Sequence, residues 1–219
     1  MKNSGETVLE ARYELVYAQS TNVFLVKEDG QYYYMDSDKN VLTEKSSAHY
    51  SKYGSFYLSM AKPCMLLYDS AFHKIENGCG KSLTSTSCNH YYLLNTDSGR
   101  ICISASGKPL HTGYFDDVVE YGCENSVRIA SKQQKYFLLN DHFQKISKEY
   151  ASIGPYNTMK RCRVRNQDFL YGWMDFEGKE LLPALYKSID IIEESKKLKA
   201  MTADGSTFWF DWDGKEIKP

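Results

Sequence analysis

The chain has 219 residues, of which 42% are hydrophobic and 25% charged, the profile of a globular protein rather than a disordered one. Its formal net charge of -1 at pH 7 lacks the basic excess that draws a nucleic-acid binder to phosphate, so we expect no nucleic-acid partner. No apolar run approaches the roughly 18 residues of a membrane span, and the opening MKNSGETVLEAR lacks the apolar segment of a secretory signal.

Cysteine usage bears on the redox compartment. An even number of cysteines in a secreted chain can mark disulfides, but a chain of this length folds without such cross-links. We therefore expect buried free thiols, which favour a cytoplasmic location, and a secreted location stays open. The cysteines are Cys64, Cys79, Cys88, Cys102, Cys123 and Cys162.

An apolar strand that ends in an acidic or small polar residue recurs along the whole chain. Successive end residues are separated by 33, 35, 36, 35 and 36 residues. A steady period of this length indicates a solenoid, a propeller or an array. These end residues, called anchors below, are Asp36, Asp69, Ser104, Asn140, Asp175 and Asp211.

Each unit is expected to hold about four short antiparallel strands, with a tight turn and a short strand after the anchor. The predicted units span approximately residues 13–46, 50–78, 81–112, 114–148, 150–184 and 186–219. The anchor strands and the strands that precede them in each unit are predicted at 13–18, 23–28, 32–36, 65–69, 100–104, 115–121, 127–130, 136–140, 150–153, 161–165, 171–175, 186–193, 197–203 and 207–211. The polar stretch 81–89 is interpreted as a loop.

The anchor strands are apolar on both faces, so both faces should be covered by neighbouring sheets. We predict an all-β chain of six repeats that forms a closed six-bladed β-propeller, with an open antiparallel β-solenoid of stacked sheets as the alternative. Residues 7–11 could pair with the last sheet and support closure. Because no unit can bury its faces alone, we expect a single repeat domain over residues 1–219.

Residues 171–186, YGWMDFEGKELLPALY, resemble the WG-repeat (KWG-repeat) proteins. Their pattern is approximately W-G-[FY]-I-D, a glycine turn, G-K-x-V-I-P and Y-D. Gly172, Asp175, Gly178 and Pro183 match it, while Tyr171 stands in place of the tryptophan. Residues 212–219 and 114–118 match parts of it. The family is mostly bacterial, and the resemblance implies an interaction scaffold with no shared catalytic residues.

Metal and catalytic sites have little support. Cys79, Cys88 and His90 are a weak zinc candidate, because their spacing is wider than zinc ligands usually show; the alternative is a polar loop. No G-x-S-x-G motif or phosphate-binding glycine loop occurs. We expect no cofactor and no catalytic residue.

Binding residues are easier to suggest. Arg161, Arg163 and Arg165 alternate along one predicted strand and should share a face that could grip carboxylates or phosphate. The alternative is a charged outer edge strand that discourages aggregation. Phe176 and Trp212 occupy the same turn position in the last two units, and could form an interface or pack against a neighbouring unit.

These observations favour a non-enzymatic repeat scaffold that binds another protein or a surface glycan. Two alternatives stay open: a hydrolase or lyase with a site in a central channel, and a bacterial immunity or regulatory protein that occludes a partner. The sequence leaves the partner's identity and the oligomeric state open.

Overall fold

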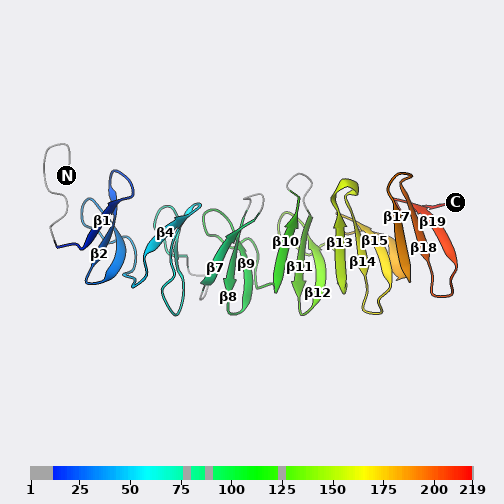
Figure 1. The fold of residues 1–219 in the computed structure, drawn as a ribbon, viewed down its shortest axis with the longest axis horizontal. Helices are drawn as coiled ribbons and strands as arrows, with labels where there is room; N and C mark the ends of the chain where they lie inside the picture. The colour runs from blue at the N-terminus through cyan, green and yellow to red at the C-terminus, as the bar shows by residue number, and fades with distance from the viewer. Residues whose placement is uncertain (1–11, 76–79, 87–90, 123–126, 219) are drawn as a thin grey trace. The chain divides into compact units, whose positions relative to one another are not determined.

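A computed structural model describes residues 12–75, 80–86, 91–122 and 127–218. The chain divides into two compact units, each described by itself: the first comprises Met1–Ser85 and His90–Pro109, and the second Thr86–Asn89 and Leu110–Pro219. Each unit carries three antiparallel sheets (Figure 1). The prediction of an all-β chain built from six repeats is confirmed. Residues 7–11 lie outside the described residues, and the single domain stays a prediction.

The first unit holds three sheets of three strands, in which strands consecutive in the chain are neighbours. Its first sheet consists of β1 (Leu15–Ala18), β2 (Val23–Glu28) and β3 (Gln31–Asp36). The second consists of β4 (Tyr50–Tyr53), β5 (Phe56–Ser59) and β6 (Leu66–Tyr68). The third consists of β7 (Gly80–Ser85), β8 (Tyr92–Thr96) and β9 (Gly99–Ile103).

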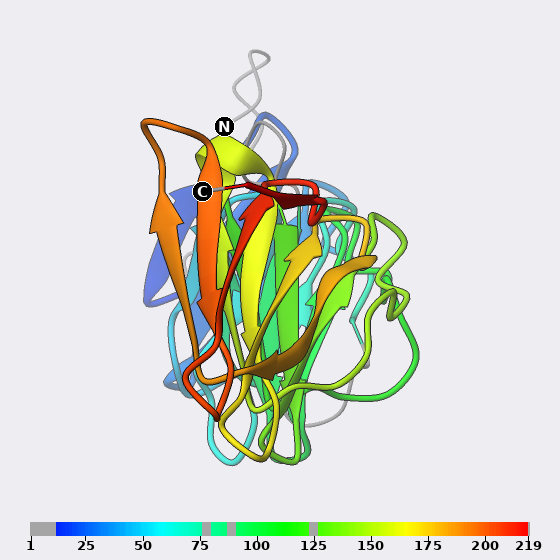
Figure 2. The ribbon, with the colours of Figure 1, turned by 90° about the vertical axis from the view of Figure 1, so that its right-hand side faces the viewer.

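The second unit follows the same order with longer sheets at its end. The fourth sheet consists of β10 (Asp117–Tyr121), β11 (Val127–Lys132) and β12 (Lys135–Leu139). The fifth consists of β13 (Ser152–Tyr156), β14 (Arg161–Arg165), β15 (Tyr171–Asp175) and β16 (Glu180–Tyr186), with a 3-10 turn η1 (Asn157–Met159) between β13 and β14. The sixth consists of β17 (Ser188–Ile192), β18 (Lys197–Met201), β19 (Thr207–Asp211) and β20 (Glu216–Ile217). Its first three strands lie side by side in the foreground of Figure 2.

The anchors form one recurring turn. In each, the anchor N–H donates to the carbonyl oxygen of the residue four positions later, as Asp175 does to Lys179. The residue three positions after the anchor then has a positive φ, as in a type I turn followed by a left-handed residue. Glycine suits this place; at Gly178 an added Cβ would also come within 2.3 Å of the Ile146 carbonyl oxygen. The positive-φ residues are Lys39, Phe72, Gly107, Phe143, Gly178 and Gly214.

Two details differ from the sequence predictions. Among the described residues, a fourth strand follows the anchor only in the fifth and sixth sheets, as β16 and β20; in the others this pairing is reduced to isolated bridges such as Leu139 with Lys145. The stretch interpreted as a loop contains a strand, β7. It lies at the edge of its sheet, where its outer side is bridged to Met65 at Gly80, and its polar side chains Lys81 and Thr84 are exposed to solvent.

The fifth sheet is covered on both faces, as its two apolar faces predict. Cys162 and Met174 on one face pack with Leu138 of the fourth sheet. Trp173 on the other face packs with Leu198 of the sixth sheet. In the first unit the second sheet is likewise enclosed by clusters on both sides. Within each unit, therefore, the core consists of the layers between successive sheets.

The cysteines divide into two kinds. Cys102 and Cys162 are buried and form no disulfide, as predicted. The prediction is wrong for Cys64, which is disulfide-bonded. Cys64 lies in the connection between β5 and β6 and is only half-buried, so no sheet core encloses its sulfur. Cys79, Cys88 and Cys123 lie outside the described residues. No helix among the described residues is long and apolar enough to cross a membrane.

Candidate interaction site

The three predicted arginines lie on β14, and the pleat directs them to one face. Cys162 and Val164 alternate with them and are fully buried on the opposite face. The order of the fifth sheet is β13-β14-β15-β16, so β14 is flanked on both sides. This excludes the alternative interpretation of an outer edge strand and leaves the charges needing another explanation.

Arg161 has a structural partner. Its Nη2 atom lies 2.6 Å from Oδ1 of Asp213, and its Nε donates to the Trp212 carbonyl oxygen at 3.4 Å. Both partners belong to the turn after β19 in the sixth sheet. Arg161 therefore ties the fifth sheet to the sixth, and its charge is matched within the unit.

Arg163 and Arg165 are different, because neither forms an ion pair in the part of the chain that the structure describes. The Arg163 guanidinium lies 5.3 Å from the ring centroid of Tyr171, and that of Arg165 lies 5.2 Å from the ring centroid of Phe169. Each such contact contributes about 0.5–1 kcal/mol at an exposed site. The Nε of Arg165 is buried without a hydrogen-bond partner. Two oriented guanidinium groups thus keep hydrogen-bonding capacity for a ligand.

A cavity of about 290 Å³ opens beside these arginines. Gly154 on β13 pairs directly with Arg163 and contributes no side chain to fill the space. A Cβ built on Gly154 would meet only the Arg163 carbonyl oxygen, at 3.9 Å, so the backbone tolerates larger residues there. We call this site the arginine cleft; it is lined by Ser152, Ile153, Gly154, Arg163, Val164, Arg165 and Tyr171.

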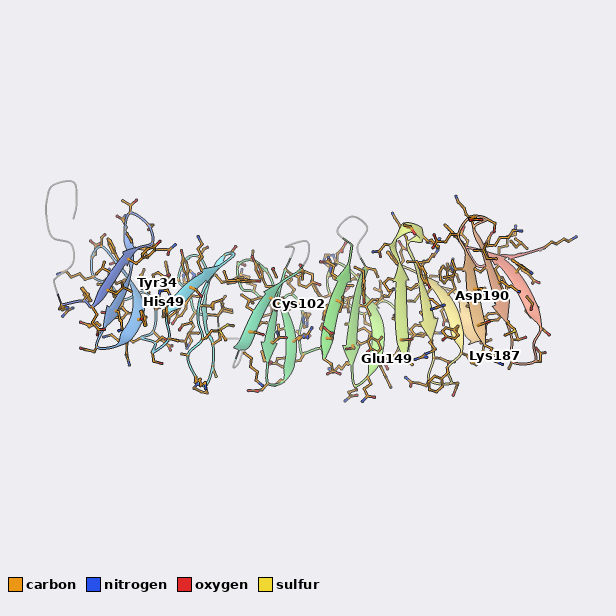
Figure 3. The ribbon with its side chains drawn as sticks, in the orientation of Figure 1. Tyr34, His49, Cys102, Glu149, Lys187 and Asp190 are labelled. Carbon is orange, nitrogen blue, oxygen red and sulfur yellow. The ribbon has the colours of Figure 1, made fainter. Side chains whose placement is uncertain are left out.

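The sixth sheet shows the same register with a different charge arrangement. Gly154, Arg163 and Trp173 follow one another across the fifth sheet. The corresponding residues across the sixth are Asp190, Lys199 and Trp209. An acidic residue directly opposite a lysine is a favourable cross-strand pair. Figure 3 labels Asp190 on its strand. The side chains of Asp190 and Lys199 form no ion pair among the described residues, but the fifth sheet has glycine where the sixth has this carboxylate, so no acidic side chain lies directly opposite Arg163.

Phe169 contacts Arg165 but is not itself a lining residue of the arginine cleft. Its side chain is 69% exposed, although its backbone has a φ of +62°. The equivalent turn of the sixth sheet has Gly205 at this position. A left-handed conformation costs an ordinary residue about 1–2 kcal/mol. An exposed aromatic ring held in a strained conformation beside a free cation is typical of a ligand-binding site rather than of a core.

Phe176 and Trp212 take part in the layers between sheets. Phe176 packs against the cluster between the fourth and fifth sheets. Trp212 packs against the cluster between the fifth and sixth, and its carbonyl oxygen accepts a hydrogen bond from Nε1 of Trp173 at 3.1 Å. Both side chains are half-buried. Their contacts fit the packing interpretation and do not bring them into the arginine cleft.

The weak zinc candidate, Cys79, Cys88 and His90, lies outside the described residues. Among the residues that are described, no group of three or more His, Cys, Asp or Glu side chains could hold a metal ion. Sequence reasoning missed Gly154, Phe169 and Tyr171. Aligning the fifth repeat with the sixth would have found the first two, because glycine replaces an aspartate and phenylalanine replaces a turn glycine.

Comparisons with known proteins give no family. No family model matches the chain, and no curated protein matches it. Among solved structures, it is similar to a eukaryotic initiation factor (TM-score 0.38, 11% identity, 94% of this chain and 64% of that one). It is also similar to the C-terminal WD40 domain of Sif2 (TM-score 0.31, 11% identity, 91% and 66%). The chain thus spans slightly less than two thirds of the length of these proteins, and TM-scores this low do not establish a shared fold.

Proposed function

We propose that the chain is a non-enzymatic repeat scaffold that binds an acidic segment of another protein at the arginine cleft. One observation carries the proposal: Arg163 and Arg165 form no ion pair among the described residues, while Gly154, directly opposite Arg163, has no side chain where the next repeat has the carboxylate of Asp190. A carboxylate from a partner would supply the counterion that Arg163 does not have within the described residues.

The geometry favours an extended segment with alternating acidic residues. Arg163 and Arg165 are two positions apart on one strand, so their Cα atoms are separated by roughly 7 Å. Side chains at alternate positions of an extended peptide repeat at the same distance. A planar guanidinium binds a carboxylate with two parallel hydrogen bonds. Two carboxylates at positions i and i+2 of the partner therefore match the two arginines.

The lining of the cleft supports binding rather than catalysis. Apart from the arginines and Tyr171, it consists of Ser152, Gly154 and the aliphatic residues Ile153 and Val164. Arginine stays protonated at neutral pH, so it positions and stabilises anions but does not exchange protons. Ser152 has no histidine or carboxylate beside it in this lining to act as a base.

Three statements stay predictions. They are membership of the WG-repeat family, a cytoplasmic location, and the closed six-bladed propeller with the open solenoid as its alternative. The six antiparallel sheets in consecutive strand order agree with the blade pattern expected of a propeller. The acidic-peptide proposal depends only on the fifth and sixth sheets.

The test uses a fluorescent peptide in which glutamate alternates with threonine, and the same peptide with glutamine in place of glutamate. We expect the full chain to bind only the acidic peptide, with an affinity that falls as salt is added. Gly154→Asp should weaken binding at least about tenfold by supplying an internal counterion, since a hydrogen bond to a charged group contributes about 1.5–3 kcal/mol. Gly154→Asn introduces a side chain of nearly the same size as aspartate but without charge, so it should weaken peptide binding less than Gly154→Asp.

A second pair of variants controls for total charge. Arg163→Glu with Arg165→Glu should abolish binding. Lys179→Glu with Lys215→Glu makes the same change in net charge at two exposed turn lysines and should reduce affinity only slightly. Equal binding of the two peptides, or equal losses in the two double variants, would show that the arginine cleft is not the site.

A further inference from the structure

A second and larger cavity, of about 650 Å³, lies on the fourth sheet. It belongs to the face of β12 that carries Phe137 and Leu139; Leu138, between them, packs toward the fifth sheet on the other face. All its lining residues belong to the second unit, and none of them lines the arginine cleft. A volume of this size is in the range of pockets for small ligands, about 300–1,000 Å³.

The walls of this cavity are aromatic. Phe115, Phe137 and Phe143 line it, and the His111 ring lies 4.4 Å from that of Phe115 and 5.9 Å from that of Phe143, measured between centroids. Burial lowers the pKa of His111, which favours the neutral imidazole, and its ring adds another flat surface to the wall. Offset or edge-on contacts with such rings stabilise a planar aromatic ligand.

The rim of the cavity is cationic. Lys132, Lys135 and Lys145 line it together with a single acid, Glu149. Glu149 is shared, because its carboxylate lies 2.7 Å from the Lys145 amine and 3.3 Å from that of Lys135. Lys132 forms no ion pair in the part of the chain that the structure describes. Three lysines against one glutamate leave two positive charges unmatched at the rim, which favours a ligand with a negative group.

Phe143 supplies an independent observation. It occupies the positive-φ position of its turn, at +57°, where three other repeats have Gly107, Gly178 and Gly214. Phe72 shares this conformation in the first unit, but its ring stacks on Tyr57 at 4.5 Å, so core packing accounts for it. Phe143 is buried as well, and the Arg128 guanidinium lies 5.3 Å from its ring centroid, but its ring also forms a wall of the cavity beside His111. The sequence thus keeps a strained aromatic residue where glycine would satisfy the turn.

We propose that this cavity binds a small aromatic carboxylate, with its ring among Phe115, Phe137 and Phe143 and its carboxylate at the lysine rim. The apolar walls and the excess of positive charge together select for this class: a neutral aromatic compound leaves the lysines unmatched, and a small inorganic anion leaves the rings uncovered. This site is separate from the acidic-peptide site, so failure of either proposal leaves the other standing.

The test titrates the full chain with 2-naphthoate and, in parallel, with 2-naphthalenemethanol, which keeps the ring but replaces the carboxylate with a neutral hydroxymethyl group. Calorimetry should show one naphthoate bound per chain, with at least tenfold weaker binding of the alcohol. Lys132→Gln with Lys135→Gln should weaken naphthoate at least tenfold, whereas Lys179→Gln with Lys215→Gln should change it less than twofold. Equal affinity for the two compounds would overturn the proposal.

Phe143→Gly separates ligand binding from folding. Glycine adopts the positive φ freely, so this variant should fold and yet lose naphthoate binding more than tenfold. Phe72→Gly is the matched control: it removes a phenylalanine from the same turn position, and should leave the naphthoate affinity within twofold. If Phe143→Gly is folded by circular dichroism and binds naphthoate as tightly as the parent chain, the proposed site is wrong.

Discussion

The fifth and sixth sheets contain the same motif in two environments. Trp173 and Trp209 hold equivalent positions on β15 and β19, each directly opposite a basic residue. Trp173 is 0% exposed and covered by the sixth sheet, whereas Trp209 lies on the opposite face of the sixth sheet from Phe210 and is only half-buried. The same residue type thus serves as core in one repeat and as surface in the next, because its role depends on what covers the sheet.

The tryptophan pair should give the largest difference in stability. Trp173→Ala is expected to lower the free energy of unfolding by about 3–5 kcal/mol, because it leaves a cavity in a packed layer and removes the hydrogen bond to the Trp212 carbonyl oxygen. Trp209→Ala should cost about 1–2 kcal/mol, since less of its surface is buried. Urea unfolding followed by circular dichroism measures both, and equal losses would contradict the structural difference between the sheets.

Two turn glycines sharpen the comparison. Gly178 and Gly205 have nearly the same φ, +86° and +88°. A Cβ added at Gly178 would come within 2.3 Å of a carbonyl oxygen, whereas a Cβ added at Gly205 would have no heavy atom within 4 Å. Gly205→Ala should therefore cost only the left-handed strain, about 1–2 kcal/mol. Gly178→Ala must also displace the backbone at Ile146, in the segment that follows β12, so its loss in the same unfolding experiment should be clearly larger.

Phe169 and Gly205 occupy equivalent turn positions. Replacing Phe169 is expected to have a small effect on the free energy of unfolding, and to raise it rather than lower it. Asparagine tolerates the left-handed conformation better than phenylalanine, and Phe169 buries little surface. Phe169→Asn should raise the free energy of unfolding by about 0.5–1 kcal/mol while weakening acidic-peptide binding through loss of the Arg165 contact. A loss of stability together with unchanged peptide binding would mean that Phe169 is structural.

The smallest expected difference is a pH dependence. The Ser206 amide donates to the Asp204 carboxylate, whereas the Leu170 amide of the fifth sheet donates to the uncharged side chain of Asn166. Hydrogen bonds from the Thr202 hydroxyl and the Ser206 amide lower the pKa of Asp204. Because the folded pKa lies below the unfolded value of about 3.9, this contribution is present above that pH and is lost as the pH falls through the folded pKa.

Amide hydrogen exchange between pH 2 and pH 5 checks this prediction. After correction for intrinsic exchange rates, protection of the Ser206 amide should fall toward the acid end, while protection of the Leu170 amide should change less. Asp204→Asn should remove the difference. Parallel loss of protection at both amides would indicate global acid unfolding instead of a local titration.

Much of the fold follows from local chemistry. The strands 23–28, 161–165, 171–175 and 207–211 were predicted with the boundaries that the structure shows, because each is an apolar run or, in 161–165, an alternation of arginine with apolar residues. β7 was missed, since an edge strand tolerates polar residues that resemble those of a loop. For the site, the sequence predicted the shared face of Arg161, Arg163 and Arg165 but not which of them stay without an ion pair.

By itself, the sequence determined the repeat period and its six copies, the anchor turns and the direction of alternate side chains on β14. These depend on interactions within a few residues: the pleat of a strand, positive φ at a turn and the hydrogen bonds of an anchor. Tertiary structure alone decided that Arg161 meets Asp213 while Arg163 faces Gly154, because those neighbours come from the stacking of sheets and the pairing of strands. Charge on a repeated scaffold becomes a candidate binding site only where that assembly leaves it unmatched.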